Sequence, residues 1–307
     1  MSRPLPAFLY NRRVSAHLSL IGANLIFGLT YAIVKQVVPD FISPFSLVFT
    51  RILGACILFW ITGIFIAREK IDRGDVLRLF LASFFGVAGN QSLFIHGLSM
   101  TSPIDSAILM TATPILVLII ARILLKEPVT LFKIAGIAAG AAGALLLIYY
   151  SGISRIGSGD PLGNALMIGN ATCFAIYLVI VKPLLVKYHP VTIMKWVFLS
   201  GLLLVSGPGL PAFLKVEWTA LPTEILLSVL YIVVGTTYLA YLLNNYSLKY
   251  VKPITVSIYD YSHPVIASIM AVLMGQDVIT IVKILSAILV FTGVYFVSYS
   301  SSRTGSG

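Results

Sequence analysis

The chain has 307 residues, of which 58% are hydrophobic and 10% are charged, with a formal net charge of +10 and a mean hydropathy of +0.98. About a quarter of the residues of a soluble globular domain are charged, so this composition excludes an ordinary water-soluble protein. The basic residues lie in the short polar breaks between apolar runs, which argues against a nucleic-acid interface and for charges that orient membrane helices.

Apolar runs long enough to cross a bilayer follow one another along the chain. A helix needs about 20 mostly apolar residues to span the hydrocarbon core, and it satisfies its own backbone hydrogen bonds. The runs predict helices at residues 14–34, 44–66, 76–97, 103–125, 130–150, 161–182, 191–213, 223–247, 253–275 and 279–300. The seventh run is broken near its end by Gly207, Pro208, Gly209 and Pro211. The pattern predicts an all-α integral membrane protein with ten transmembrane helices.

The distribution of Lys and Arg predicts how these helices are oriented. If the N-terminus is cytoplasmic, most of the 21 basic residues fall on the cytoplasmic side, and Arg51 alone lies inside the membrane. The basic residues left on the outer side are Lys35, Arg155, Lys215 and Lys283. Because cytoplasmic loops accumulate positive charge, both termini are predicted to be cytoplasmic, with tails at residues 1–13 and 301–307.

An internal repeat divides the chain into two halves, residues 14–150 and 161–300. The matches at an offset of 150 residues are Pro103 with Pro253, Pro114 with Pro264, Thr130 with Thr280, Lys133 with Lys283 and Gly143 with Gly293. The matches at an offset of 146 residues are Asn24 with Asn170, Tyr31 with Tyr177 and Pro44 with Pro190. Each half holds five predicted helices, so the second half must enter the membrane in the opposite orientation. Inverted repeats are an architecture of secondary transporters, whose site lies near the midplane between the repeats.

Two stretches resemble the drug/metabolite transporter superfamily in its EamA-type branch. The first runs from Phe27 and Gly28 through Lys35 and Pro44 to Arg51. The second comprises Pro103, Ala107, Thr111, Pro114, Leu125, Glu127, Thr130, Gly136 and Gly143. The sequence departs from the family pattern at Phe27, where a tryptophan is usual, and at Gln276-Asp277, where a Gly-Glu pair is common. The resemblance implies a multi-pass protein of the cell (inner) membrane that exports amino acids or other metabolites.

The matched prolines predict kinks at the same depth in the fourth and ninth helices. The second proline of each half lies eleven residues beyond the proline at the helix start, about 16 Å into the bilayer. A proline frees the carbonyl four residues earlier, here on Met110 and Asp260, and inside a membrane that carbonyl needs a partner. The kinks are either packing features rescued by Thr111 or Thr113 or part of a transport cavity, and their occurrence in both halves favours the cavity.

Asp260 is the most informative single residue of the predicted site. A carboxylate about seven residues into a membrane helix is unfavourable by about 3 kcal/mol unless it faces a cavity or a partner. Asp260 is expected to bind a substrate ammonium group or to cycle a proton, or else to form a structural pair with Arg51 or a tyrosine hydroxyl. Arg51 is expected either to anchor the structure or to bind a substrate carboxylate. Asp105 is expected to be the partner of Arg51 or a solvated helix cap.

Polar and aromatic residues of the other central helices complete the predicted substrate site. For each of them alone, helix packing or an interfacial position is the better explanation, but together they favour an uncharged or zwitterionic solute with apolar or aromatic bulk over a phosphorylated one. The predicted substrate-binding residues are Asn24, Thr30, Tyr31, Arg51, Asn90, Gln91, Thr111, Pro114, Asn170, Tyr177, Tyr238, Tyr259, Asp260, His263 and Pro264. Tyr231, Thr237 and Tyr241 are further candidates on the eighth helix.

Several other residues are predicted to be structural. Gly136, Gly140 and Gly143 form a small-residue face on the fifth helix, suited to close helix packing within the fold or between two protomers. Glu127 and Asp277 precede the fifth and tenth helices, where a carboxylate favours the positive end of the helix dipole.

The predicted function is a secondary transporter that moves a small organic solute, an amino acid or a similar metabolite, by alternating access, with export implied by the family resemblance. The alternatives are a facilitative carrier or a channel for another small metabolite. No Walker motif is present, and His96 and His263 have no second ligand at a useful spacing, so no direct use of ATP, no enzyme activity, no metal and no cofactor are predicted. The expected partners are a small-molecule substrate and membrane lipid, with no nucleic acid, while proton coupling and homodimerisation stay open.

Overall fold

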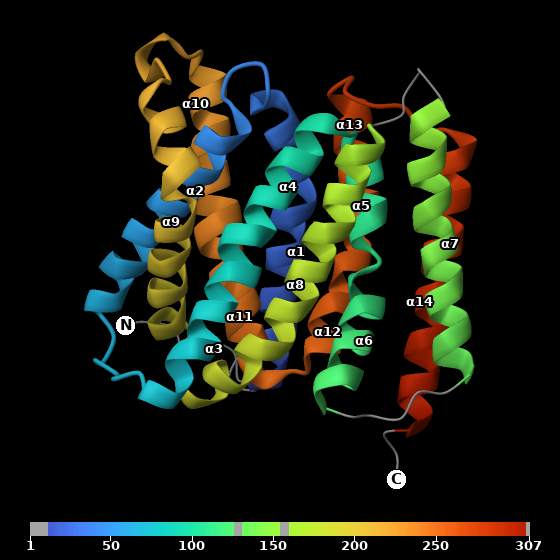
Figure 1. The fold of residues 1–307 in the computed structure, drawn as a ribbon, viewed down its shortest axis with the longest axis horizontal. Helices are drawn as coiled ribbons and strands as arrows, with labels where there is room; N and C mark the ends of the chain where they lie inside the picture. The colour runs from blue at the N-terminus through green and yellow to red at the C-terminus, as the bar shows by residue number, and fades with distance from the viewer. Residues whose placement is uncertain (1–11, 126–130, 154–159, 305–307) are drawn as a thin grey trace, which may run out of the picture.

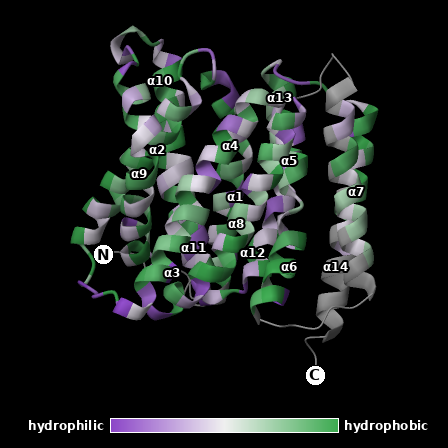
Figure 2. Ribbon diagram, in the orientation of Figure 1, coloured by the Kyte–Doolittle hydropathy of each residue, from purple (hydrophilic) through white to green (hydrophobic). Residues whose placement is uncertain are grey.

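The computed structural model describes residues 12–125, 131–153 and 160–304, and all regular structure within these ranges is helical. The all-α prediction is therefore confirmed for this part of the chain. Within it, eight helical segments are long and apolar enough to cross a membrane. They are Val14–Val37, Pro44–Ile64, Arg73–Met100, Pro103–Leu124, Pro161–Lys187, Pro190–Leu214, Thr223–Tyr250 and Pro253–Leu273. Figure 2 shows hydrophobic colours along most of their length and hydrophilic residues mainly near their ends.

The helices are labelled in Figure 1 and follow the predicted order. The first half contains α1 (Arg12–Val37), α2 (Pro44–Ile64), α3 (Arg73–Ser83), the π-helix η2 (Phe84–Ala88), α4 (Gly89–Met100), α5 (Pro103–Met110), α6 (Thr113–Leu125) and α7 (Leu131–Ile153). The second half contains α8 (Pro161–Lys187), α9 (Pro190–Leu214), the short 3₁₀ turn η3 (Trp218–Ala220), α10 (Thr223–Leu230), the π-helix η4 (Tyr231–Leu239), α11 (Ala240–Tyr250), α12 (Pro253–Ile258), the 3₁₀ turn η5 (Tyr259–Ser262), α13 (His263–Leu273) and α14 (Ile281–Thr304).

Prolines mark the first turn of many of these helices, as the sequence pattern indicates. A proline fits there because its missing N–H would have no partner within the helix and its φ is already helical. The residue before the proline then caps the helix: Ser43 accepts a hydrogen bond from the backbone of Ser46, and Ser102 does so from Asp105 at 3.1 Å. These caps fix where α2 and α5 begin.

The structure differs from the predicted boundaries at several helix ends, by up to five residues at α8, which runs to Lys187 where the prediction ends at residue 182. Helix α9 continues through Pro208 and Pro211 to Leu214, so the expected break is absent. Prolines are tolerated in membrane helices because neighbouring helices can satisfy or shield the freed groups, and here α2 packs along α9. Helix α1 begins at Arg12 and α14 extends to Thr304, so parts of both predicted tails are helical.

The two halves pack on each other in corresponding ways. Helix α1 packs on α11 as α8 packs on α4, and α1 packs on α13 as α8 packs on α6. Helices α2 and α9 pair with each other, and so do α7 and α14 at one edge of the bundle (Figure 1). In Figure 1, α5 and α6 descend from the upper to the lower edge, whereas α12 and α13 ascend from the lower to the upper edge.

A half-buried lysine caps the end of a helix in each half, and we call these two contacts the lysine staples. The Lys35 ammonium group donates to the carbonyl groups of Leu98, Ser99 and Thr101 at 3.1, 3.0 and 2.9 Å, where α4 ends. The Lys182 ammonium group donates in the same way where α11 ends, to the carbonyl groups of Leu248, Lys249 and Val251. A positive charge at the carboxyl end of a helix satisfies carbonyl groups that have no partner within the helix.

Replacing either staple lysine with methionine is expected to lower the free energy of unfolding by about 2 kcal/mol, since hydrogen bonds to a charged group are lost and the side-chain length is kept. The double variant Lys35→Met/Lys182→Met should show the sum of the two losses, because the staples share no residue. Thermal unfolding in detergent measures this, with the exposed Lys252→Met as the control. Equal stability of the control and the staple variants would contradict the capping role.

A buried lysine, Lys283, corrects the prediction made for Asp105. The Lys283 ammonium group lies 2.5 Å from a carboxylate oxygen of Asp277 and 3.3 Å from one of Asp105, and it contacts the Ser102 hydroxyl. Asp105 is therefore neither the partner of Arg51 nor a solvated cap, because it is fully buried against Lys283. Asp277 likewise pairs with Lys283 and accepts a hydrogen bond from the backbone of Ile104, which joins α5 to the segment before α14. Glu127 lies outside the described residues.

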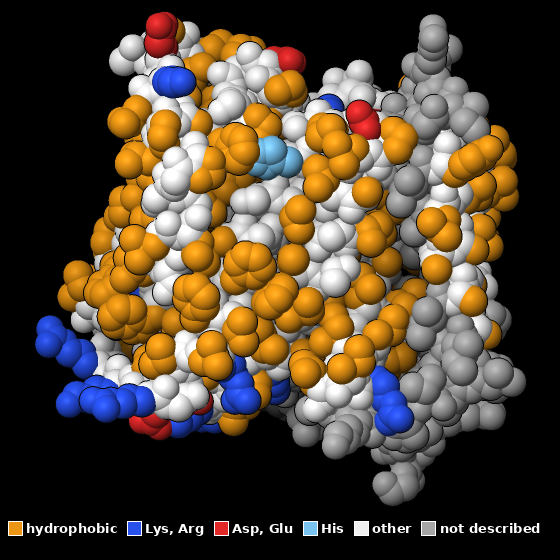
Figure 3. All heavy atoms as spheres, viewed as in Figure 1, with side chains coloured by type: hydrophobic (Ala, Val, Ile, Leu, Met, Phe, Trp, Pro, Cys, Tyr) orange, Lys and Arg blue, Asp and Glu red, His pale blue; other side chains and the backbone are white. Residues whose placement is uncertain are grey.

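Charged side chains gather at the two edges of the molecule. On the face shown in Figure 3, most Lys and Arg side chains lie along the lower edge. Lys187 at the end of α8 forms ion pairs with Asp72 and with Asp75, the latter at 2.7 Å, and the Tyr188 hydroxyl donates to Asp75 at 2.9 Å. This network ties the turn between α8 and α9 to the start of α3.

The small-residue face of α7 packs within the fold. A Cβ atom at Gly293 of α14 would lie 2.4 Å from the carbonyl oxygen of Gly136 and 2.6 Å from the backbone nitrogen of Gly140. Only glycine permits helices to approach so closely. This contact selects packing within the fold over packing between protomers for these two glycines.

Candidate functional site

Both spans with a matched inner proline are interrupted near their middle. Helix α5 ends at Met110 and α6 begins at Thr113, while in the other half the turn η5 separates α12 from α13. The Thr113 hydroxyl donates to the Met110 carbonyl at 2.6 Å, and the backbone N–H of His263 donates to the backbone carbonyl of Asp260. The interruptions thus occur where the prolines predict them, and groups of the chain satisfy both freed carbonyls. Of the two threonines predicted to satisfy the Met110 carbonyl, Thr113 does so, whereas the Thr111 hydroxyl donates to the Ile108 carbonyl.

A cavity of about 60 Å³ lies beside these interruptions. Both halves contribute to its wall, with residues from α1, α2, α4 and α5 facing residues from α8, η4, α11, η5 and α13. Eight of the predicted substrate-binding residues line it: Thr30, Tyr31, Arg51, Asn90, Gln91, Asn170, Asp260 and His263. The cavity therefore brings together residues that lie up to 233 positions apart in the chain, between Thr30 and His263.

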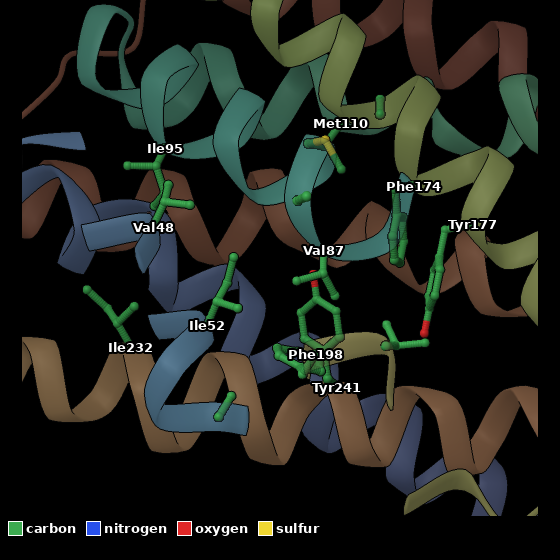
Figure 4. Close-up of a cluster of buried hydrophobic side chains, with 14 of the residues drawn as sticks. Val48, Ile52, Val87, Ile95, Met110, Phe174, Tyr177, Phe198, Ile232 and Tyr241 are labelled. Carbon is green, nitrogen blue, oxygen red and sulfur yellow. The ribbon is translucent and has the colours of Figure 1, made fainter. Parts of the chain in front are cut away.

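The rest of the wall is mainly apolar and aromatic. Phe27, Phe94, Met110, Phe174, Thr236 and Tyr241 complete it. Figure 4 shows Met110, Phe174 and Tyr241 within the buried cluster that continues from the cavity wall into the core. Sequence reasoning named Tyr241 but not the three phenylalanines, since an aromatic residue in an apolar run gives no sign of facing a cavity.

Seven predicted site residues lie outside the wall of this cavity. Four of them have hydrogen-bond partners elsewhere. The Asn24 side chain donates to the Leu20 carbonyl in its own helix, and the Tyr177 hydroxyl donates to the Asn245 side chain at 2.6 Å. The Tyr238 hydroxyl lies 2.6 Å from the Thr62 hydroxyl, and the Tyr259 hydroxyl lies 2.8 Å from Nδ1 of His17. Thr111, Pro114 and Pro264 shape the interruptions rather than the wall. Helical periodicity places a residue at a depth in the membrane, but the rotation of each helix decides which neighbour the side chain meets.

Arg51 brings a buried positive charge to the cavity. Its side chain is held from one side only: Nε donates to the Thr237 hydroxyl at 2.9 Å, and the Thr237 hydroxyl in turn donates to Ile232 within the π-helix η4. The guanidinium carbon lies 5.9 Å from the centre of the Phe94 ring. The residue is 3% exposed, and Nη1 has no hydrogen-bond partner among the described residues. No carboxylate in the described part of the chain forms an ion pair with Arg51, so the expected structural pair with Asp260 is absent.

Asp260 brings a buried carboxylate to the other side of the same cavity. It is 3% exposed, and one carboxylate oxygen lies 4.0 Å from Nε2 of His263. The other oxygen, Oδ2, has no hydrogen-bond partner among the described residues. His263 is itself held by Tyr31, whose hydroxyl lies 3.5 Å from Nδ1. The carboxylate of Asp260 thus lies near an imidazole and not near the guanidinium, and its Oδ2 has no partner among the described residues.

The paired asparagines of the two halves bond the helices that carry them. Asn170 donates to the Asn90 carbonyl at 2.8 Å, and Asn90 donates to the Asn170 carbonyl at 3.3 Å. The Tyr241 hydroxyl donates to the Asn90 side chain at 3.1 Å. Asn90 and Asn170 therefore both line the cavity and join α4 to α8, so the two readings proposed for them coexist.

Within the residues that the structure describes, no group of three or more His, Cys, Asp or Glu side chains is arranged to hold a metal ion. His96, the other intramembrane histidine, bonds through Nδ1 to the carbonyl of Ser92 at 2.8 Å and stacks edge-on against Phe45.

The sequence matches a known family in both halves. The profile of the EamA-like transporter family matches residues 14–149 and 161–299. The chain is 27% identical to the uncharacterized transporter YyaM of Bacillus subtilis, over 92% of this chain and 93% of that protein. It is 26% identical to an uncharacterized transporter of Archaeoglobus fulgidus, over 88% and 94% of the two chains. It is 23% identical to the protein WALLS ARE THIN 1 of Arabidopsis thaliana, over 76% and 70%.

A solved structure described only as the crystal structure of a protein superposes with a TM-score of 0.65. The superposition covers 95% of this chain and 99% of the other, at 16% sequence identity. At that identity the likeness concerns the fold alone, and it extends over nearly the whole of both chains.

Proposed function

Because the chain belongs to the EamA-like transporter family, we propose that it is a secondary transporter that carries a small organic solute across the cell (inner) membrane by alternating access. The observation that carries this proposal is the cavity between the two halves, where a guanidinium group and a carboxylate are both buried and each keeps one atom without a partner. Buried charges inside a membrane protein mark substrate or ion pathways.

Two inverted repeats would supply the moving parts. Each half matches the same family profile, each carries a lysine staple, and α5–α6 and α12–α13 run in opposite directions. We include α7 and α14 with the eight apolar spans as membrane-crossing helices, which makes ten and returns both termini to the same side. The basic residues at the lower edge then lie in the cytoplasm (Figure 3).

An α-amino acid or a similar metabolite is the proposed substrate, and export is the proposed direction. The wall of the cavity offers one positive group, one negative group and several aromatic rings, which suits a zwitterion with an apolar side chain. Arg51 is the one Lys or Arg side chain among the residues that line the cavity, so the cavity is poorly suited to a phosphorylated solute. The direction rests on the family resemblance.

Counterflow in liposomes tests the proposed function. Purified protein is reconstituted, the vesicles are loaded with one unlabelled amino acid or metabolite of a panel, and entry of the labelled solute is followed. A carrier should show entry that is accelerated by solute on the opposite side, because the loaded form changes orientation. Entry that is independent of the internal solute would indicate a channel, and entry no faster than into protein-free vesicles for the whole panel would refute the transport function for these solutes. Reporter fusions at the C-terminus test the proposed topology.

A further inference from the structure

The buried charges of the cavity come from different halves of the molecule. Arg51 lies on α2 in the first half, and Asp260 lies on η5 in the second half. Both line the same cavity, yet no ion pair joins them in the described structure. The free atoms are Nη1 on the guanidinium and Oδ2 on the carboxylate. A cation and an anion therefore border one small space without neutralising each other.

Each charged group is fixed by contacts that leave one of its buried atoms without a hydrogen-bond partner among the described residues. Thr237 binds Arg51 through Nε, and the Phe94 ring lies beside the guanidinium, so the side chain cannot turn away without losing both contacts. Asp260 is held in the turn η5, which separates the two parts of one interrupted helix, α12 and α13. Nε2 of His263 lies near only one of its carboxylate oxygens, Oδ1. Such fixed and partly unpaired groups are suited to binding a complementary ligand, because their desolvation has already occurred on folding.

We propose that the substrate is a zwitterion that bridges the two halves, with its carboxylate on Nη1 of Arg51 and its ammonium group on Oδ2 of Asp260. The inference rests on the proposed transport function and assigns the polarity of its site. The substrate carboxylate would accept a hydrogen bond of about 2.9 Å from Arg51, and the substrate ammonium group would donate one to Asp260, in place of the ion pair that the two side chains do not form with each other. An aromatic amino acid is larger than the cavity of about 60 Å³, so the two halves must move apart to admit it, and its apolar side chain would then lie against Phe27, Phe94 and Phe174.

Bridging makes both charges necessary for transport and not only for binding. A ligand with one charged group contacts one half strongly and leaves the opposite charge of the other half unpaired. Only a ligand with both groups stabilises the state in which the halves close on it, and a ligand shifts an equilibrium only by its differential affinity for the two states. Molecules that lack one charge are therefore expected to compete for the site and to be exchanged slowly.

The test uses L-phenylalanine together with 2-phenylethylamine, which lacks the carboxylate, and 3-phenylpropionate, which lacks the amine. Counterflow of L-leucine and L-phenylalanine in proteoliposomes of the wild-type chain should exceed that of either analogue by about 100-fold. Absence of counterflow for every solute of the wider panel would count against the proposed function itself. Exchange of an analogue as fast as that of L-phenylalanine would leave the function intact and refute the bridging role.

Two substitutions that each remove one charge test which residue binds which end of the substrate. Arg51→Gln should lower kcat/KM for L-phenylalanine about 100-fold and remove the preference over 2-phenylethylamine, because the carboxylate no longer has a charged partner. Asp260→Asn should have the reciprocal effect and remove the preference over 3-phenylpropionate. The exposed residues Arg122 and Glu224 provide the controls Arg122→Gln and Glu224→Gln.

Correct folding of the variants is checked by monodisperse elution and by their unfolding temperature in detergent. A variant that elutes as a single species and keeps the full wild-type selectivity refutes the role proposed for the substituted residue in binding the carboxylate or the ammonium group of the substrate. Counterflow needs no proton gradient, so a role of Asp260 limited to proton cycling would leave counterflow and selectivity of Asp260→Asn unchanged, and that outcome also overturns the proposal. If either variant does not fold, the comparison of L-phenylalanine with its two analogues on the wild-type chain still decides whether transport needs both charged groups of the substrate.

Discussion

Replacing Lys283 with methionine is expected to lower the free energy of unfolding by about 3–5 kcal/mol. The Lys283 side chain is 4% exposed and lies between the carboxylates of Asp105 and Asp277, whose side chains are 0% and 1% exposed. Methionine fills a similar volume but removes the ammonium group that both buried carboxylates contact. Thermal or denaturant unfolding in detergent measures the loss.

A neutralised cluster separates the effect of charge from that of shape. The triple variant Lys283→Met/Asp105→Asn/Asp277→Asn removes the uncompensated charges and should recover most of the lost stability, because a buried ion pair is often replaced at little net cost by neutral groups. Lys283→Arg keeps the charge and is expected to lose less than Lys283→Met. If the triple variant is as unstable as Lys283→Met, the loss does not arise from removing the Lys283 charge beside the two carboxylates.

Adding a single methyl group at Gly293 is expected to destabilise the protein by about 3 kcal/mol. The new Cβ would lie 2.4 Å from the carbonyl oxygen of Gly136 and 2.6 Å from the backbone nitrogen of Gly140, and backbone atoms cannot move aside as a side chain can. Helix α14 must then shift away from α7 along their shared face. The unfolding temperature and the yield of monodisperse protein after extraction measure the effect of Gly293→Ala.

Gly207 offers a matched control for this substitution. It also lies inside a helix, α9, but nothing stands within 4 Å of the position that its Cβ would occupy. Alanine is the better helix former by about 1 kcal/mol, so Gly207→Ala should leave stability unchanged or raise it. The two substitutions are identical in chemistry and are predicted to differ in sign. Equal effects of the two would mean that the close approach of α7 and α14 contributes little to stability.

The sequence predicted much of the helical framework because the forces that set it are local. Runs of apolar residues predict the helices, and a proline preceded by a polar cap fixes where α2 and α5 begin. The interruptions beside Pro114 and Pro264 follow from the missing backbone N–H of proline. The π-helices η2 and η4 were not predicted, since a widened turn depends on contacts with neighbouring helices and not on residue type.

Side-chain partners were predicted less well, because they depend on how helices rotate about their axes. Lys283 meets Asp105 across a long sequence separation, and nothing near either residue in the sequence indicates this pairing. Tyr177 and Tyr238 have the same residue type as Tyr31, yet of these three only Tyr31 lines the cavity. Residues such as Asp260 and Arg51 were easier to identify, because a charge in an apolar run has few alternatives to a cavity or a partner.

The lysine staple of the first half has a consequence for how the chain enters the membrane. In the proposed orientation, Lys35 and Lys283 lie on the outer side, where positive charge opposes the preferred direction of insertion. Both are bound after folding, Lys35 by three backbone carbonyls and Lys283 by two carboxylates. At these two positions a neutral residue would favour insertion in a single direction, whereas the lysine stabilises the folded protein. Losing either lysine would therefore make the direction of insertion more uniform and leave the inserted protein less stable.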